Sequence, residues 1–364
     1  MATYRSLKDI DWAMMFLTLC LCLIGVLQIY SVTHATPAWR DAWWKQILFL
    51  ITGLLLMWLI MVIDYHTLLG QTPVFYAVTL FLLVLTFAIG KRVLGAGRWI
   101  PLPLGLHFQV SEFAKLVIVL LVARFLTELK KDTVEFWDVI RMIGLVGLPM
   151  VLVMKQPDLG TSLTYLPPLI VGIFLAGLRW QYVAGFLLLV GIASPLGYMM
   201  MRPYQKSRLE VFLNPNLDPQ GEGYQIIQSK IAVGQGGMWG RGATQGSQTQ
   251  LKFLPVPHTD FIFSTFAEEH GFVGVVVTLG LYFLLLMQIV QNAQTAPDRA
   301  GMYLCMGVAS VILLHVLVNV GMVVGQMPVT GIPLPLLSYG GSSIWSMFLM
   351  LGLVNNVRLR RFVN

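Results

Sequence analysis

The chain has 364 residues, of which 57% are hydrophobic and only 11% are charged, and its mean hydropathy is +0.74. In soluble domains about a quarter of the residues are charged, so this composition excludes an ordinary soluble protein and predicts an all-α, polytopic membrane protein. The net charge of +7 does not indicate a nucleic-acid-binding protein, because the basic residues are dispersed among apolar segments. Membrane topology and contact with anionic lipids explain them better.

A membrane-spanning helix needs about 20 apolar residues. Ten segments reach or approach this length, which predicts ten transmembrane helices in a single domain covering residues 1–364. The first is longer than the apolar core of a signal peptide and no typical cleavage site follows it, so it is predicted to be an uncleaved span. The predicted spans are Trp12–Tyr30, Trp43–Ile63, Pro73–Ile89, Ser111–Thr127, Arg141–Met154, Ser162–Leu178, Val183–Met201, Phe272–Gln291, Gly301–Met322 and Ser343–Val357.

An even number of spans puts both termini on one side of the membrane. Lysine and arginine in the short loops are more frequent on that side, which predicts cytoplasmic termini. The extracytoplasmic side then carries a long loop, residues 202–271, together with the segments Lys91–Gln109, Gln156–Thr161 and Met327–Ser342. Because polar residues gather at one surface and not at the bilayer midplane, the pattern favours a surface site over a transporter.

The fourth predicted span opens with a Glu112 and a Lys115 that are three residues apart and can pair on one helix face. A lysine one turn inside a span must find a carboxylate. Asp158, in the turn after the fifth span, is a second candidate partner. The pattern leaves two alternatives open: Lys115 snorkels to the interface beside Glu112, or it joins the fourth and fifth spans beneath a functional site.

The long extracytoplasmic loop contains basic residues that can neutralise a diphosphate, with anchoring to lipid headgroups as an equal alternative. An amphipathic helix is predicted from Tyr224 to Val233. The six glycines from Gly234 to Gly246 predict a pliable interfacial loop. They do not predict a nucleotide site, since no strand precedes them.

The stretch Leu251–Gly274 holds the only dense set of acids and histidines in the chain. Thr259 and Asp260 stand where a helix N-cap belongs, so a helix is predicted to begin there, with Glu268 on the face of Asp260 and Glu269 on the opposite side. Asp260 either caps this helix or acts as a general base on a substrate hydroxyl. Spacing alone does not choose between these roles.

Prolines and glycines from Pro328 to Gly341 predict a rigid extracytoplasmic loop before the tenth span, which Ser342 or Ser343 would cap. Irregular backbone beside a bilayer is tolerated where it is buried in protein or lines a cavity. This loop is therefore a candidate wall for a lipid groove.

Six blocks, in this order along nearly the whole chain, resemble those of the SEDS family of bacterial cell-wall proteins (shape, elongation, division and sporulation). The chain looks closer to the elongation member of that family than to the division member. It departs from the family pattern at Gly97, Val110 and Val256, which leaves Asp260 intact. The blocks are GAGRWI (Gly95–Ile100), SEFAK (Ser111–Lys115), QPDLGTS (Gln156–Ser162), YQIIQSKIAVGQGG (Tyr224–Gly237), HTDFIF (His258–Phe263) with AEEHG (Ala267–Gly271), and PLPLLSYGGSS (Pro333–Ser343).

The resemblance implies a ten-helix protein of the bacterial plasma (inner) membrane. It also implies a peptidoglycan glycosyltransferase that polymerises lipid II during cell elongation and shape maintenance, by an inverting mechanism with an aspartate as general base. The family's essential aspartate falls on Asp260, and its supporting positions fall on Glu112, Lys115 and Asp158. The implied substrates are lipid II and a polyprenyl-diphosphate-linked glycan.

The leaving diphosphate would need its charge offset, by Arg98, Arg202 or Arg208 or by a divalent cation (Mg or Mn). The implied partner is a class B penicillin-binding protein, which would cross-link the glycan, and other membrane proteins of the elongation complex such as MreC and MreD are further candidates. Two rival functions stay open. A lipid II flippase needs the same lipid recognition without a base, and a non-catalytic scaffold of the elongation machinery needs neither.

Overall fold

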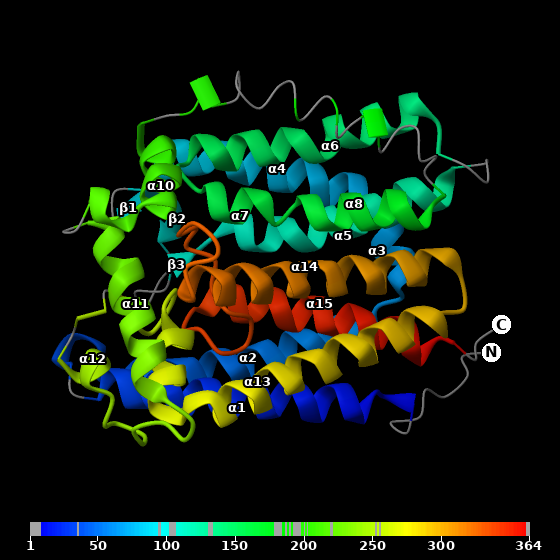
Figure 1. The fold of residues 1–364 in the computed structure, drawn as a ribbon. Coiled ribbons are helices and arrows are strands. Elements are labelled where there is room, and N and C mark those ends of the chain that lie inside the picture. Colours follow the sequence, from blue (N-terminus) through cyan, green and yellow to red (C-terminus); the bar gives the residue numbers. More distant parts are fainter. Residues whose placement is uncertain are drawn as a thin grey trace.

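A computed structural model describes residues 9–34, 36–93, 96–101, 107–129, 134–177, 203–218, 221–251, 253–254 and 256–361, and isolated positions at 184–185, 188, 191, 198–199 and 201. The long helices run side by side in one bundle (Figure 1). Those helices are α1 (Trp12–Thr33), α2 (Ala42–Val62), α4 (Thr72–Ile89), α5 (Val110–Glu128), α6 (Phe136–Lys155), α7 (Leu159–Leu163) continued by α8 (Leu166–Leu175), α13 (Ile262–Gln294), α14 (Arg299–Val323) and α15 (Gly341–Leu359).

Six of the described helices, α1, α2, α4, α6, α13 and α14, are long and apolar enough to cross a membrane. The protein is therefore a multi-pass membrane protein whose spanning part is all-α, as predicted. The predicted fourth and tenth spans are α5 and α15, and the sixth is the interrupted pair α7 and α8. The predicted seventh span, Val183–Met201, and Arg202 lie outside the described residues apart from isolated positions.

Two helices begin well ahead of the predicted spans. α6 begins at Phe136 because Glu135 and Asp138 form a capping box there. α13 begins at Ile262, ahead of the predicted eighth span, and continues through Gly271, whose positive φ of 65° interrupts the helical conformation. Glycine adopts such a φ without steric cost, so the helix kinks there without ending.

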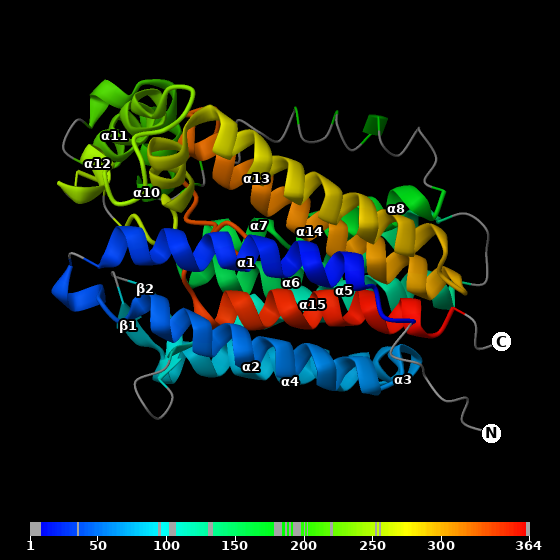
Figure 2. The ribbon, with the colours of Figure 1, turned by 90° about the horizontal axis from the view of Figure 1, so that it is seen from below.

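The shorter elements gather at one end of the bundle, as Figure 2 shows for α10, α11 and α12. The helix predicted from Tyr224 to Val233 is present as α11. Only α3 lies at the opposite end among the short helices described (Figure 1). The bounds are η2 (Pro37–Trp39), α3 (Tyr65–Gly70), α10 (Pro203–Leu213), η4 (Pro215–Leu217), α11 (Glu222–Gly236) and α12 (Ser247–Gln250).

The Lys91–Gln109 segment, predicted as a loop, contains a three-stranded antiparallel sheet of β1 (Lys91–Val93), β2 (Ala96–Pro101) and β3 (His107–Phe108). In the register, Lys91 lies opposite Trp99 and Ile100 lies opposite Phe108. Strands of two to six residues are too short to give a clear alternating pattern. The sheet gives β2, and hence Arg98, a fixed position at the end of the bundle.

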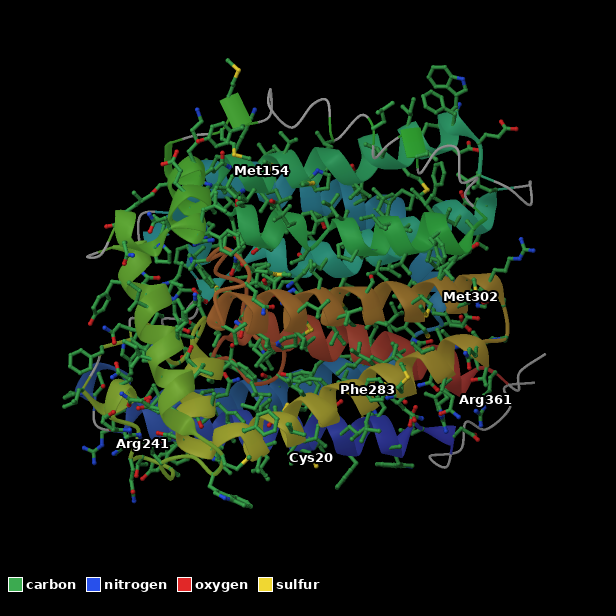
Figure 3. The ribbon with its side chains drawn as sticks, viewed as in Figure 1. Cys20, Met154, Arg241, Phe283, Met302 and Arg361 are labelled. Atoms are coloured by element: carbon green, nitrogen blue, oxygen red, sulfur yellow. The ribbon has the colours of Figure 1, made fainter. Side chains whose placement is uncertain are left out.

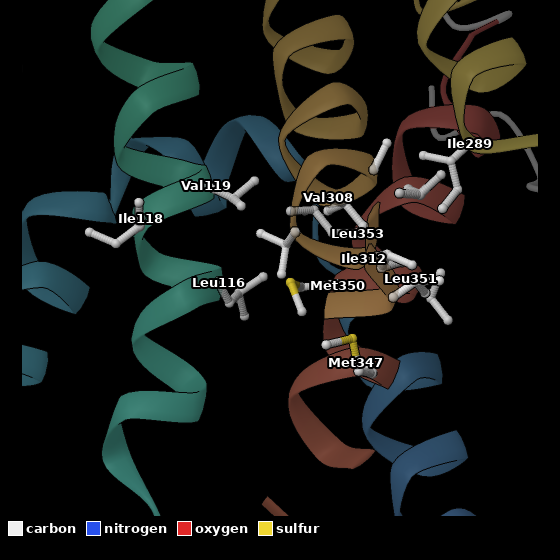
Figure 4. Close-up of a cluster of buried hydrophobic side chains, with 14 of the residues drawn as sticks. Leu116, Ile118, Val119, Ile289, Val308, Ile312, Met347, Met350, Leu351 and Leu353 are labelled. Carbon is white, nitrogen blue, oxygen red and sulfur yellow. The ribbon is translucent and has the colours of Figure 1, made fainter. Parts of the chain in front are cut away.

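The core lies between α5, α14 and α15. Figure 4 shows Leu116 and Val119 of α5 facing Val308 and Ile312 of α14, with Met350 of α15 beside them, and all five are buried. α14 is the most buried of the six candidate spans, whereas only 22% of the apolar stretch is buried in each of α4, α6 and α13. An apolar surface of that extent belongs against lipid.

The start of α1 and the end of α15 lie at the same end of the bundle, opposite the sheet and α10 to α12 (Figures 1 and 2). In Figure 3, Arg361 marks the end with the termini and Arg241 marks the other. This arrangement is expected of an even number of crossings, and it separates the termini from the Asp260 segment.

Candidate active site

Asp260 lies in a turn directly before α13, at the end of the bundle that carries the sheet. α13 begins at Ile262 with Phe261 in the N-cap position, and no side chain caps it. The predicted helix start at Thr259 and Asp260 is therefore wrong, and so is the capping role of Asp260.

The physical reason is that the carbonyl groups of residues 258–260 bond to other elements. In a helix they would accept the N–H groups four residues ahead. Here they accept donors from α14 and from the loop before α15, which keeps the turn out of the helix. The three bonds are Tyr339 N–H to His258 O (3.0 Å), Ser338 Oγ–H to Thr259 O (2.7 Å) and Asn319 Nδ2–H to Asp260 O (2.9 Å).

The carboxyl of Asp260 is half-buried among charged groups from three other elements. Burial raises the pKa of this carboxyl above its ordinary value. Arg98 of β2 and, more weakly, Arg208 of α10 oppose this rise in pKa, while the like charge of Asp158 adds to it. Four of the predicted site residues, Asp260, Asp158, Arg98 and Arg208, are thus brought together.

Asp158 is almost fully buried and pairs with Arg98, with 2.9 Å between Oδ1 and Nη1. Its Oδ2 accepts a hydrogen bond of 3.0 Å from Gln109 Nε2, and its Oδ1 accepts one of 3.2 Å from Thr161 N–H, so it also caps α7. Asp158 therefore fixes the guanidinium of Arg98 beside Asp260. It is not the partner of Lys115, which was one of the alternatives.

Lys115 is fully buried, so the predicted snorkelling is wrong as well. Its Nζ lies 2.7 Å from Glu112 Oε2 and 3.2 Å from His315 Nε2. The other ring nitrogen of His315, Nδ1, lies 3.1 Å from Pro333 O. The cluster therefore joins α5 to α14 and to the loop before α15, and not to the turn after α6.

The two adjacent acids of α13 bond to different elements. Glu268 is fully buried and accepts bonds of 2.8 Å from Gln248 N–H and Thr249 Oγ–H, so it caps α12 from outside that helix. Glu269 accepts a bond of 2.6 Å from Ser31 Oγ–H on α1. Glu268 thus bonds to α12, which precedes Asp260 in the chain, and Glu269 bonds α13 to α1.

The glycine-rich segment of residues 234–246 packs closely against the start of α13. A Cβ on Gly236 would lie 2.0 Å from Ala267 O, and a Cβ on Gly240 would lie 2.1 Å from Glu269 O. The N–H of Arg241 donates to Glu268 O over 3.0 Å. Glycine is needed here because the segment lies directly against the start of α13.

His258 belongs to an aromatic cluster at the same turn. Its ring centroid lies 4.3 Å from that of Trp39 and 5.8 Å from that of Tyr339. Burial lowers the pKa of His258 to about 4, so its imidazole is neutral at physiological pH. His258 therefore adds no positive charge to the turn that carries Asp260.

The loop before α15 differs from prediction at its end. α15 begins at Gly341 with Gly340 in the N-cap position, and neither Ser342 nor Ser343 caps it. Ser342 Oγ instead accepts Gln109 N–H over 3.0 Å, which ties the loop to the sheet. The loop is largely buried in protein, one of the two settings that tolerate irregular backbone in a membrane.

The described residues contain no group of three or more His, Cys, Asp and Glu side chains that could hold a metal ion. At Asp260 two carboxylates lie near two guanidinium groups. Guanidinium groups suit a phosphate.

Comparison with known proteins gives the family of the chain. The family model that covers FtsW, RodA and SpoVE, described as cell cycle protein, matches residues 12–361. The chain belongs to this family, the SEDS proteins. Its predicted resemblance is thereby confirmed over nearly the whole sequence.

Curated relatives of this SEDS chain cover almost its full length. The peptidoglycan glycosyltransferase MrdB of Escherichia coli (strain K12) is 37% identical, over 99% of this chain and 96% of the relative. The peptidoglycan glycosyltransferase RodA of Treponema pallidum is 34% identical, over 98% and 99%. The stage V sporulation protein E of Bacillus subtilis is 38% identical, over 95% and 96%.

Two solved structures share the fold. A chain from a study of structural coordination of polymerization and crosslinking by a peptidoglycan synthase complex has a TM-score of 0.83 and 34% identity, covering 98% of this chain and 99% of that one. The rod shape determining protein RodA of Thermus thermophilus has a TM-score of 0.71 and 31% identity, covering 97% and 98%.

Several contacts of this site were not predicted from the sequence of the SEDS chain, notably those of Asn319, His315 and Ser338. A polar residue inside an apolar span gives a weak signal, since buried polar groups need partners. The partners of Asn319 and Ser338 in the Asp260 turn lie 59 and 79 positions away. No local pattern identifies contacts at such separations.

Proposed function

We propose that this SEDS protein is a peptidoglycan glycosyltransferase that polymerises lipid II into glycan strands during cell elongation. The observation that carries the proposal is the Asp260 carboxylate, which lies in a turn at one end of a membrane bundle, where the charges of Arg98 and Arg208 act on it. The names of the relatives MrdB and RodA support the activity.

The proposed setting is the bacterial plasma membrane, crossed by ten helices, with Asp260 outside and both termini in the cytoplasm. The position of α1 and α15 supports this orientation, because the start of one and the end of the other lie opposite the Asp260 end (Figure 1). The greater number of basic residues in the loops on the side of the termini supports it too.

In the proposed reaction, Asp260 takes the proton from the sugar 4-hydroxyl of lipid II. The oxygen attacks the anomeric carbon of the glycan carried on a polyprenyl diphosphate, and the new glycosidic bond forms with inversion. The bond from that carbon to the diphosphate oxygen breaks, and the diphosphate leaves with the electron pair. A general base contributes about 10²–10⁴-fold, most efficiently when its pKa is near the operating pH, and the raised pKa of Asp260 moves in that direction.

The arginines supply the charge that the diphosphate needs. Guanidinium groups can bind phosphate through two parallel N–H bonds. Arg98 keeps its position through its pair with Asp158, and the charge of Arg208 on α10 acts more weakly on Asp260. Arg202 is proposed for the same role from its place in the sequence. Glu112 and Lys115 act at a distance, by fixing α5 beneath the loop that bonds to the Asp260 turn.

The proposed partner is a class B penicillin-binding protein that cross-links the new glycan. Similarity to a chain of a peptidoglycan synthase complex, studied for its coordination of polymerization and crosslinking, supports this partner. MreC and MreD are proposed as further members of the same assembly.

The test is polymerisation of labelled lipid II by the reconstituted protein, with and without the partner. Glycan strands that depend on Asp260 support the proposal. Transport of lipid II across liposomes without polymerisation would support the flippase instead. Activity in neither assay, from protein that still assembles with the partner, would support the scaffold.

The rate of polymerisation is expected to fall as the pH drops through the pKa of Asp260, because only the ionised carboxylate accepts a proton. Since burial raises this pKa, the acidic limb of the rate profile should lie above the range of an ordinary aspartate, about 3.9. Arg98→Gln removes a charge that lowers the pKa, so it should move the limb to higher pH.

Arg241→Gln is the matched control for that profile. Arg241 is an exposed arginine at the same end of the bundle, and its Nε donates to Gln235 O. Its loss should leave the limb in place. An acidic limb that Arg98→Gln does not move would show that another group controls the profile.

A further inference from the structure

The turn that carries Asp260 is neither helix nor strand, so its position depends on bonds from its neighbours. Asn319 of α14 supplies two of these bonds. Its Nδ2 donates to Asp260 O over 2.9 Å and to Ile332 O over 2.8 Å. One amide group therefore joins the turn to the loop before α15.

Asn319 works here as a donor only. The side chain is fully buried, and its Oδ1 has no hydrogen-bond partner among the described residues. Two carbonyl groups can share one NH₂ group, but they cannot accept a hydrogen bond from an oxygen that carries no hydrogen. An aspartate at this position would have nearly the same shape and would set an oxygen against both carbonyl groups.

Ser338 makes a second bridge between the same two segments. Its Oγ donates to Thr259 O over 2.7 Å and accepts Leu334 N–H over 2.8 Å. The serine is buried, so water does not replace a lost bond easily. Its hydroxyl acts on the residue directly before Asp260.

The loop reaches the carboxylate itself as well as the backbone. A Cβ placed on Gly331, which has a φ of +72°, would lie 3.5 Å from Asp260 Oδ2. A shift between the turn and the loop would therefore change the surroundings of the carboxylate directly.

We propose that Asn319 and Ser338 are positioning residues of the glycosyl transfer, which hold the Asp260 carboxylate at the acceptor hydroxyl by bonding its turn to the loop of residues 331–338. The inference rests on the proposed function. It assigns these two side chains an effect on the chemical step and not on lipid II binding, because their bonds go to the Asp260 turn and to the loop.

The experiment measures kcat and KM for lipid II with the full-length protein and its partner. A displacement of about 1 Å at a reacting group costs roughly 100-fold in rate. Ser338→Ala and Asn319→Asp should therefore lower kcat by about 10- to 100-fold, with KM within about twofold of wild type. Ser338→Thr keeps the hydroxyl and should restore most of the kcat.

Ser310→Ala is the matched control. Ser310 is a buried serine of α14 whose Oγ, among the described residues, bonds only to Gly307 O in its own helix, so its loss should leave kcat unchanged. Thermal unfolding identifies variants that do not fold. If Asn319→Asp is one of them, the comparison of Ser338→Ala with Ser338→Thr decides.

The inference is overturned if folded Ser338→Ala keeps the wild-type kcat. It is also overturned if the loss in kcat/KM of this variant comes entirely from a rise in KM, or if folded Ser338→Thr is as slow as Ser338→Ala. Each of these outcomes leaves wild-type polymerisation intact. Failure of the proposed function differs, because the wild-type protein itself would then make no glycan.

Discussion

Asp260→Asn is expected to abolish glycan synthesis while the protein still folds, inserts in the membrane and binds lipid II. Asparagine has nearly the same shape but cannot take up the hydroxyl proton. Loss of a general base costs about 10²–10⁴-fold in rate. The measurement is the initial rate of labelled lipid II polymerisation, with lipid II binding and thermal unfolding recorded on the same preparation.

Asp41→Asn is the matched control for this substitution. Asp41 precedes α2 at the same end of the bundle, is exposed, and makes no capping hydrogen bond. Its neutralisation should leave polymerisation unchanged. Wild-type rates from Asp260→Asn would rule out Asp260 as the base, and an equal loss from Asp41→Asn would show that the assay responds to surface charge.

Lys115→Met is expected to lower the free energy of unfolding by about 3–5 kcal/mol, because it leaves the buried carboxyl of Glu112 without its partner. Loss of the bond to His315 also weakens the attachment of the loop before α15. Activity should therefore fall together with stability. The measurement is denaturant unfolding of the purified protein, followed by tryptophan fluorescence.

Two further variants separate the charge effect from lost packing. Lys115→Met combined with Glu112→Gln removes both charges, so it should cost less than Lys115→Met alone. Glu128→Gln breaks an exposed pair with Arg124 on the same helix and should cost about 1 kcal/mol or less. A double variant as unstable as the single one would show that the charge of Glu112 is not what destabilises the protein.

The membrane spans could be predicted because the residues of each span alone define it. About 20 apolar residues in sequence suffice to define a helix in lipid, where every backbone group must be bonded within its own segment. α1 and α14 follow the prediction within a few residues for this reason. The short strands of the sheet show no such local pattern, and they were not predicted.

The site was predicted only as a set of residues. The six sequence blocks identified Asp260, Asp158 and Arg98. The sequence did not show which of these charged side chains pair with each other. The sequence offered two carboxylates as partners for Lys115, Glu112 on its own helix face and Asp158 in the turn after the fifth span. The fold brings Glu112 and His315 to Lys115 and leaves Asp158 to Arg98.

The sequence by itself determined that this protein crosses the membrane repeatedly, that it belongs to the SEDS family, and that one aspartate of a polar segment is its candidate base. The tertiary structure alone decided that Asp260 does not cap α13. Donors from α14 and from the loop before α15 take the carbonyl groups that the first helical turn would have used. Local sequence sets which groups need partners, and only the packing of distant segments sets which partner each group finds.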